Sequence, residues 1–197
     1  GTNIGEILTV FFAMIFWRQT PLLSMQLLWI NLVTDSLPAI ALGMEAIDPN
    51  VMDRQPKPKK EGIFANGLGI QVVLQGVMFA ILSLIGFRVG SQVTGAIEGG
   101  RTMAFLVLAF AQILHAYNMR SHKSLFKTGL FTNKYLNLAS LVSTALMCLV
   151  LFVPPIASVF GLIRLPMKLY MLGFGLAVVP VVVLEIVKAF GLVKHHK

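Results

Sequence analysis

Two acidic residues lie inside apolar segments of the chain, where a charged side chain is costly. Glu6 falls within the apolar stretch at about 3–16, and Asp35 within the stretch at about 22–44. A charge at the centre of a membrane helix costs roughly 2.5–3.5 kcal/mol even on the most permissive insertion scale. Neither segment contains a central lysine or arginine that could pair with its acid. Both acids are therefore candidates for a functional site.

Further oxygen-bearing side chains share a helix face with each acid. Asn3 precedes Glu6 by three residues, and residues three or four apart lie on one side of a helix. Asn31, Thr34 and Asp35 stand at i, i+3 and i+4, which again places them on one helix face. A glutamine lies in the middle of a later apolar segment. The six candidate metal ligands are Asn3, Glu6, Asn31, Thr34, Asp35 and Gln112.

These six side chains offer oxygen and no sulfur. Carboxylate, amide and hydroxyl oxygens suit hard cations such as calcium, magnesium or sodium, and calcium takes six to eight of them. Two other interpretations stay open. A proton relay would use similar acids, and a lone amide such as Asn3 or Gln112 often forms a hydrogen bond between membrane helices.

Pro38 predicts a distortion beside this cluster. A proline has no N–H to donate to the carbonyl four residues earlier, here that of Thr34, and its ring crowds that carbonyl. We expect the helix to kink or unwind near Pro38. An irregular helix at the centre of a bilayer can expose carbonyl oxygens to a cation.

The chain as a whole has the composition of a membrane protein. Hydrophobic residues make up 56% and charged residues 12%, whereas a soluble domain carries about 25% charged residues. A membrane-spanning helix needs about 20 mostly apolar residues. We predict an all-α membrane protein of about six transmembrane helices, the first truncated and the second kinked. The predicted segments are about 3–16, 22–44, 62–87, 103–118, 135–153 and 166–190.

The basic residues predict the orientation in the membrane. Eleven of the 16 lysines and arginines lie at 45–61, at 119–134 or in the C-terminal segment from 188 onward. By the positive-inside rule these parts face the cytoplasm. The glycine-rich stretch 88–102 and the segment 154–165 are then loops on the opposite side. We interpret the net charge of +8 as a topology signal with lipid headgroups as partners, not as a nucleic-acid surface.

Other polar residues within the apolar segments are expected to be structural. We expect His115 to be hydrogen-bonded or to lie at the membrane interface, and Glu185 to pair with Lys188 three residues later. The single cysteine, Cys148, is expected to be a buried apolar side chain. Because the apolar pattern starts immediately after Gly1, we also expect the chain to be part of a longer protein.

Longer motifs identify a family. The stretch 26–38, QLLWINLVTDSLP, resembles the sixth transmembrane helix of P-type calcium ATPases. MDRQPKPK at 52–59 resembles the cytoplasmic loop that follows it, and NIGE at 3–6 resembles the ligand-bearing part of the fifth helix. The resemblance covers the whole chain as helices five to ten. It implies ligand-bearing helices at 1–44, a cytoplasmic loop at 45–61, helices seven to ten at 62–190 and a cytoplasmic tail at 191–197.

The resemblance also implies which residues hold the ion. Asn3 and Glu6 match ligand positions of helix five, and the three candidates of 31–35 match those of helix six. Gln112 matches the ligand position of helix eight, where sarcoplasmic-reticulum-type pumps carry Glu and plasma-membrane-type pumps carry Gln. That departure leaves open whether one or two calcium ions bind.

The remaining parts of such a pump are not in this sequence. The family phosphorylates an Asp in a DKTGT motif and supplies a further ligand from a PEGL motif, and neither motif occurs here. The resemblance thus implies partners: helices one to four and the actuator, nucleotide and phosphorylation domains, where ATP and Mg²⁺ bind. The chain alone is then not catalytic, although the full-length protein is an enzyme, a calcium-transporting ATPase.

Alternatives to this interpretation differ in architecture or only in the ion. The chain could be a free-standing cation channel or secondary transporter, or part of a pump for sodium or manganese. We expect a multi-pass integral membrane protein in the plasma membrane of a prokaryote.

Overall fold

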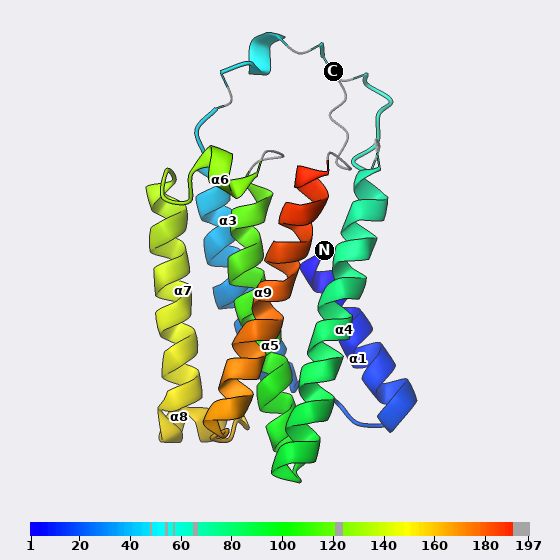
Figure 1. Cartoon of the computed structure of the whole chain (residues 1–197), viewed down its shortest axis with the longest axis vertical. Helices are drawn as coiled ribbons and strands as arrows, with labels where there is room; N and C mark the ends of the chain where they lie inside the picture. The colour runs from blue at the N-terminus through cyan, green and yellow to red at the C-terminus, as the bar shows by residue number, and fades with distance from the viewer. Residues whose placement is uncertain (48, 54, 57, 65–66, 121–123, 191–197) are drawn as a thin grey trace.

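The computed structural model describes residues 1–197 except 48, 54, 57, 65–66, 121–123 and 191–197, and the described residues form helices and no strand (Figure 1). The predicted tail at 191–197 lies outside the described residues. The helices of the bundle are α1 (Thr2–Trp17), the continuous run of α2 (Ser24–Trp29), a π-helix (Ile30–Asp35) and α3 (Ser36–Gly43), then α4 (Leu68–Thr94), α5 (Ile97–Met119), α7 (Lys134–Phe152) and α9 (Met167–Ala189). The connections between them contain a 3₁₀ turn (Val51–Asp53), α6 (Leu125–Thr128) and α8 (Pro154–Val159).

Among the described residues, five helical segments are long and apolar enough to cross a membrane. They are the continuous run Ser24–Gly43, which joins α2, the π-helix and α3, together with α4, α5, α7 and α9. At 16 residues, α1 is shorter than a full span. The prediction of an all-α membrane protein is confirmed, and its first helix is a short one.

The connections gather at the two ends of the bundle. The 3₁₀ turn and α6 lie at one end, while α8 and the turn between α4 and α5 lie at the other (Figure 1). This is the grouping of loops that the charge pattern predicts. Which end faces the cytoplasm stays a prediction.

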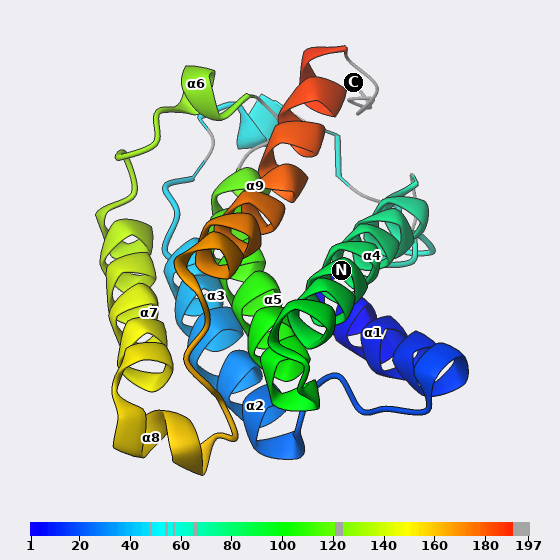
Figure 2. The ribbon, with the colours of Figure 1, turned by 60° about the horizontal axis from the view of Figure 1, so that its bottom comes forward.

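Helix α5 forms the centre of the bundle. It lies between α4, α9 and the α2–α3 run in the second view (Figure 2). In the most apolar part of α5, 78% of the residues are buried inside the protein, whereas the share is 28–33% in the other four membrane-spanning segments. The other segments therefore pack around α5. Its sequence from Thr102 to Ala111 has small and apolar side chains on every face, as a helix surrounded by protein requires.

The predicted loop at 88–102 is wrong, because helices fill most of that stretch. Helix α4 continues to Thr94 and α5 begins at Ile97, so the connection is only two residues long. Gly95 ends α4 with a φ of 68°, a left-handed conformation that glycine adopts without a steric penalty.

The other glycines of this stretch serve close packing. A Cβ atom on Gly90 would lie 2.6 Å from the carbonyl oxygen of Gly99, and one on Gly100 would lie 2.6 Å from that of Phe87. Side chains at these positions would separate α4 from α5. Small residues commonly allow such close helix contacts in membranes.

Two predicted structural residues have different outcomes. Glu185 lies 3.6 Å from the Lys188 amino group, which confirms the predicted pair. His115 is buried, with its ring edge-on to Phe79 at 5.1 Å, and its Nδ1 has no hydrogen-bond partner in the described part of the chain. The ring thus packs against Phe79 of α4, and the expectation of a hydrogen-bonded or interfacial histidine stays a prediction.

The close contact between α4 and α5 predicts the effect of a single methyl group. We expect Gly90→Ala to lower the free energy of unfolding by about 1–3 kcal/mol, because the backbone of α5 must move away. Gly175→Ala is the matched control, since no atom lies within 4 Å of the added Cβ. Thermal unfolding of the detergent-solubilised protein measures both. Equal melting temperatures for the two variants would contradict the packing argument.

Candidate functional site

The helix that carries three of the candidate ligands is irregular at the ligands themselves. Between α2 and α3 the chain forms a π-helix over Ile30–Asp35, and Pro38 lies in the first turns of α3. The distortion predicted from Pro38 is thus present as a widened turn rather than as an unwound segment. The missing N–H and the bulk of the ring act on Thr34, inside the π-helix. Single-turn π segments are frequent at functional sites.

Side chains hold the backbone carbonyls of the π-helix. Ser36 Oγ donates to the carbonyl oxygen of Asn31 at 2.7 Å, and Ser143 Oγ of α7 donates to that of Val33 at 3.0 Å. Sequence reasoning missed Ser143. It lies 110 residues from Val33, so no local pattern could connect them.

Glu6 joins three elements through its carboxylate. Asn31 Nδ2 of the π-helix donates to one oxygen at 2.9 Å, and Gln112 Nε2 of α5 donates to the other at 2.9 Å. Thr34 Oγ1 donates to Gln112 Oε1 at 3.2 Å, which closes the arrangement. We call Glu6, Asn31, Thr34 and Gln112 the polar cluster.

The polar cluster is shielded from solvent. Glu6 is 7% exposed, Gln112 3% and Thr34 1%. Among the described residues, no lysine or arginine forms an ion pair with Glu6 or with Asp35. The polar contacts of Glu6 come instead from the neutral amides of Asn31 and Gln112.

The other two candidates lie outside the polar cluster. Asp35 is half-buried at the end of the π-helix, and its carboxylate accepts a hydrogen bond from the side chain of Thr2 in α1. Asn3 is exposed, and the described structure contains no hydrogen bond between it and the cluster. The structure thus unites four candidates, places Asp35 next to α1, and leaves Asn3 apart.

The chemistry of this donor set fits a hard cation. The polar cluster and Asp35 together supply two carboxylates, two amides and one hydroxyl from α1, the π-helix and α5. Within the described residues there is no group of three His, Cys, Asp or Glu side chains that would suit zinc or another transition metal. The amides of Asn31 and Gln112 present their nitrogen atoms to Glu6 in this arrangement, so both must turn before their oxygens can bind a cation.

Comparison with known proteins places the chain in a family. Residues 19–190 match the family described as "Cation transporting ATPase, C-terminus". The chain is 37% identical to calcium-transporting ATPase 1 of Bacillus cereus over 94% of its length, and 38% identical to the calcium-transporting ATPase of Bacillus subtilis over 91%. It is 29% identical over 95% of its length to calcium-transporting ATPase type 2C member 1 of Pongo abelii.

The chain spans 20–23% of the length of these three relatives. The matched region of 19–190 contains the π-helix and all five of the membrane-spanning segments. Such a match favours the pump over a free-standing channel or secondary transporter. The chain belongs to the family of C-terminal regions of cation-transporting ATPases.

Proposed function

We propose that this chain forms the ion-binding and translocation part of an ATP-driven calcium pump. The observation that carries the proposal is the position of Glu6, whose buried carboxylate links α1 to the π-helix and to α5. A buried acid held from three elements can bind a dehydrated cation and respond to the movement of any one of them. The names of the relatives support calcium as the transported ion.

Glu6, Asn31, Thr34, Asp35, Gln112 and Asn3 are the proposed ligands. Rotation of two amide groups exchanges N–H donors for oxygen ligands and frees both Glu6 oxygens for the ion. Two carboxylates neutralise one divalent cation, which makes its burial at low dielectric tolerable. Asn3 can join only if α1 turns, because its side chain now faces outward.

Release of the ion requires a second arrangement of these ligands. A ten-thousandfold difference in affinity needs roughly 5.5 kcal/mol of differential binding. Withdrawal of one carboxylate can supply much of this amount, and the π-helix is the proposed moving part. On release, Glu6 and Asp35 take up protons, because two bare carboxylates in this setting are costly.

The source of energy lies in the rest of the pump. We propose that ATP and Mg²⁺ bind in cytoplasmic domains beyond this chain and that an Asp there is phosphorylated, as the family resemblance implies. Helices one to four complete the ion site, and the lipid bilayer surrounds the bundle; nucleic acid is no partner. The bacterial relatives support the plasma membrane of a prokaryote as the location.

Substitution of one carboxylate tests the proposal directly. We expect Asp35→Asn in the full-length pump to abolish calcium-dependent phosphorylation by labelled ATP, because the shape is kept and the charge is lost. Glu98→Gln, an exposed acid in the first turn of α5, is the control and should behave like the parent. Normal calcium-dependent phosphorylation of Asp35→Asn would refute the assignment.

The same assay identifies the ion. Phosphorylation of the parent is measured with calcium, sodium or manganese as the only added transported cation. Calcium should support it at the lowest free concentration. Phosphorylation that is activated by sodium or manganese and not by calcium would mean that the pump transports that ion instead.

The role of Gln112 generates a separate prediction. We expect Gln112→Ala to raise the free calcium needed for half-maximal phosphorylation about tenfold, which corresponds to about 1.4 kcal/mol. The reason is the loss of one ligand oxygen and of the partner of Thr34. Gln75→Ala on α4 removes an equally buried amide outside the polar cluster and serves as the control. An equal shift in both variants would indicate a packing effect only.

A further inference from the structure

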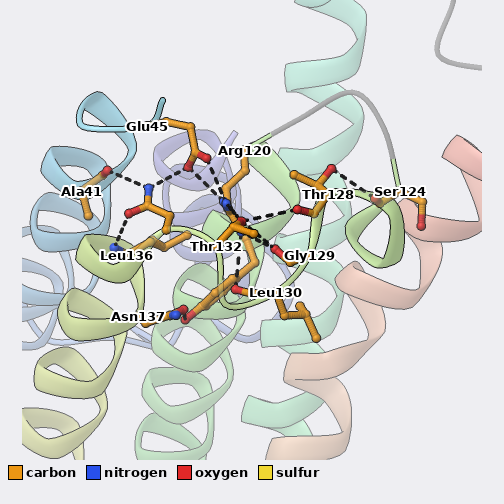
Figure 3. Close-up of polar contacts among 12 residues, drawn as sticks. Ala41, Glu45, Arg120, Ser124, Thr128, Gly129, Leu130, Thr132, Leu136 and Asn137 are labelled. Carbon is orange, nitrogen blue, oxygen red and sulfur yellow. Dashed lines mark hydrogen bonds and ion pairs between the residues drawn. The ribbon is translucent and has the colours of Figure 1, made fainter. Parts of the chain in front are cut away.

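An ion pair ties the end of α3 to the end of α5. Glu45 lies two residues beyond α3, and Arg120 immediately follows α5. Arg120 Nε donates to one Glu45 oxygen at 3.0 Å and Nη2 to the other at 2.9 Å (Figure 3). Such a two-point contact fixes orientation as well as distance.

The contacts of Arg120 leave it little freedom. Its side chain is 1% exposed, whereas that of Glu45 is 27% exposed. Its guanidinium also donates to the carbonyl oxygen of Gly129 at 2.8 Å and to the hydroxyl of Thr132 (Figure 3). Hydrogen bonds from this guanidinium hold the pKa of Glu45 below its ordinary value, so the carboxylate stays charged at neutral pH.

Asn133, the residue before α7, also binds Glu45 and so connects the start of α7 to the Glu45–Arg120 ion pair. Its Nδ2 donates to Glu45 at 2.6 Å and to the carbonyl oxygen of Ala41 at 3.2 Å. Its Oδ1 accepts from the backbone N–H of Leu136 at 3.0 Å and caps α7. We call Glu45, Arg120 and Asn133 the α3 clamp.

The α3 clamp acts on the helix that carries the candidate ligands. Helix α3 starts directly after Asp35 and is eight residues long, so about 12 Å of continuous helix separates the clamp from the π-helix. The far end of the same run is also fixed, because Gln26 Nε2 donates to the carbonyl oxygen of Phe160 at 2.9 Å. Both ends are held while the irregular segment lies between them.

We propose that Glu45, Arg120 and Asn133 are positioning residues that set the calcium affinity of the site, and this inference depends on the proposed function. By holding the register of α3, the clamp keeps Asn31 and Thr34 directed toward Glu6 and Gln112. When the α3 clamp is weakened, α3 can shift along its axis, and the π-helix then adopts arrangements whose side chains cannot bind the ion. Apparent affinity falls in proportion to the fraction of molecules that remain competent.

The test measures calcium-dependent phosphorylation of the full-length pump across a series of free calcium concentrations. We expect Glu45→Gln to raise the half-maximal calcium concentration about three- to tenfold. The level at saturating calcium should stay near that of the parent, because the ligands themselves remain. Glu98→Gln makes the same change of charge at the other end of α5 and should not alter the half-maximal concentration.

Two further variants separate positioning from general damage. Asn133→Ser keeps a residue that can cap α7 but removes the donors to Glu45 and Ala41, so it should shift calcium dependence in the same direction. The double variant Glu45→Gln/Arg120→Gln should shift it no more than the larger single effect, since both act through one pair.

Three results would overturn the inference. The first is a half-maximal concentration in Glu45→Gln within twofold of the parent. The second is a loss of the saturating level or of thermal stability alone, which a merely structural contact would produce. The third is full additivity in the double variant. Asp35→Asn is measured in parallel. If Asp35→Asn keeps calcium-dependent phosphorylation, the proposed function fails. If Asp35→Asn loses it but the Glu45 variants keep the half-maximal calcium concentration of the parent, only this inference fails.

Discussion

A carboxylate buried among membrane helices must find hydrogen-bond donors, and this constraint on Glu6 organises the rest of the structure. No cation from a lysine or arginine of the described residues reaches it. The donors are neutral amides on two other elements, at Asn31 and Gln112. In hydrocarbon there is no water to replace a lost partner, so the three elements are tied together by the needs of one side chain. Once both amides turn, their oxygens and those of Glu6 would suit a calcium ion, which would supply the missing positive charge.

Close packing of glycines brings α1 near enough for Glu6 to act in this way. A Cβ atom on Gly76 of α4 would lie 2.5 Å from the side chain of Ile4, and one on Gly5 would lie 2.7 Å from that of Phe79. Helix α4 packs equally closely on α5 through Gly90. The short helix α1 therefore approaches the central helix by way of α4. Small residues thus stabilise this bundle by allowing close contact between helix backbones, whereas a soluble core is stabilised mainly by burial of bulky apolar side chains.

The ligand-bearing helix combines fixed ends with an irregular middle. Gln26 holds one end to the segment after α8, and Glu45 holds the other to α5 and α7. Between them the π-helix has its carbonyls held by Ser36 and Ser143. A helix with this distribution of contacts cannot move easily as a rigid rod. Its local geometry can change where the backbone is already irregular, and that is where the proposed ligands lie.

The sequence by itself determined the membrane class, most of the apolar segments, the six candidate ligands and the distortion near Pro38, because composition, helix periodicity and the missing proline N–H are local properties. It could not separate the structural glycines of 88–102 from a loop, since close approach and flexibility both require a residue without a side chain. Only the tertiary structure joined Glu6 to Gln112, turned Asn3 outward, buried His115 and paired Glu45 with Arg120. The physical reason is distance along the chain: contacts that span 75 or 106 residues depend on how helices pack, and no local pattern records them.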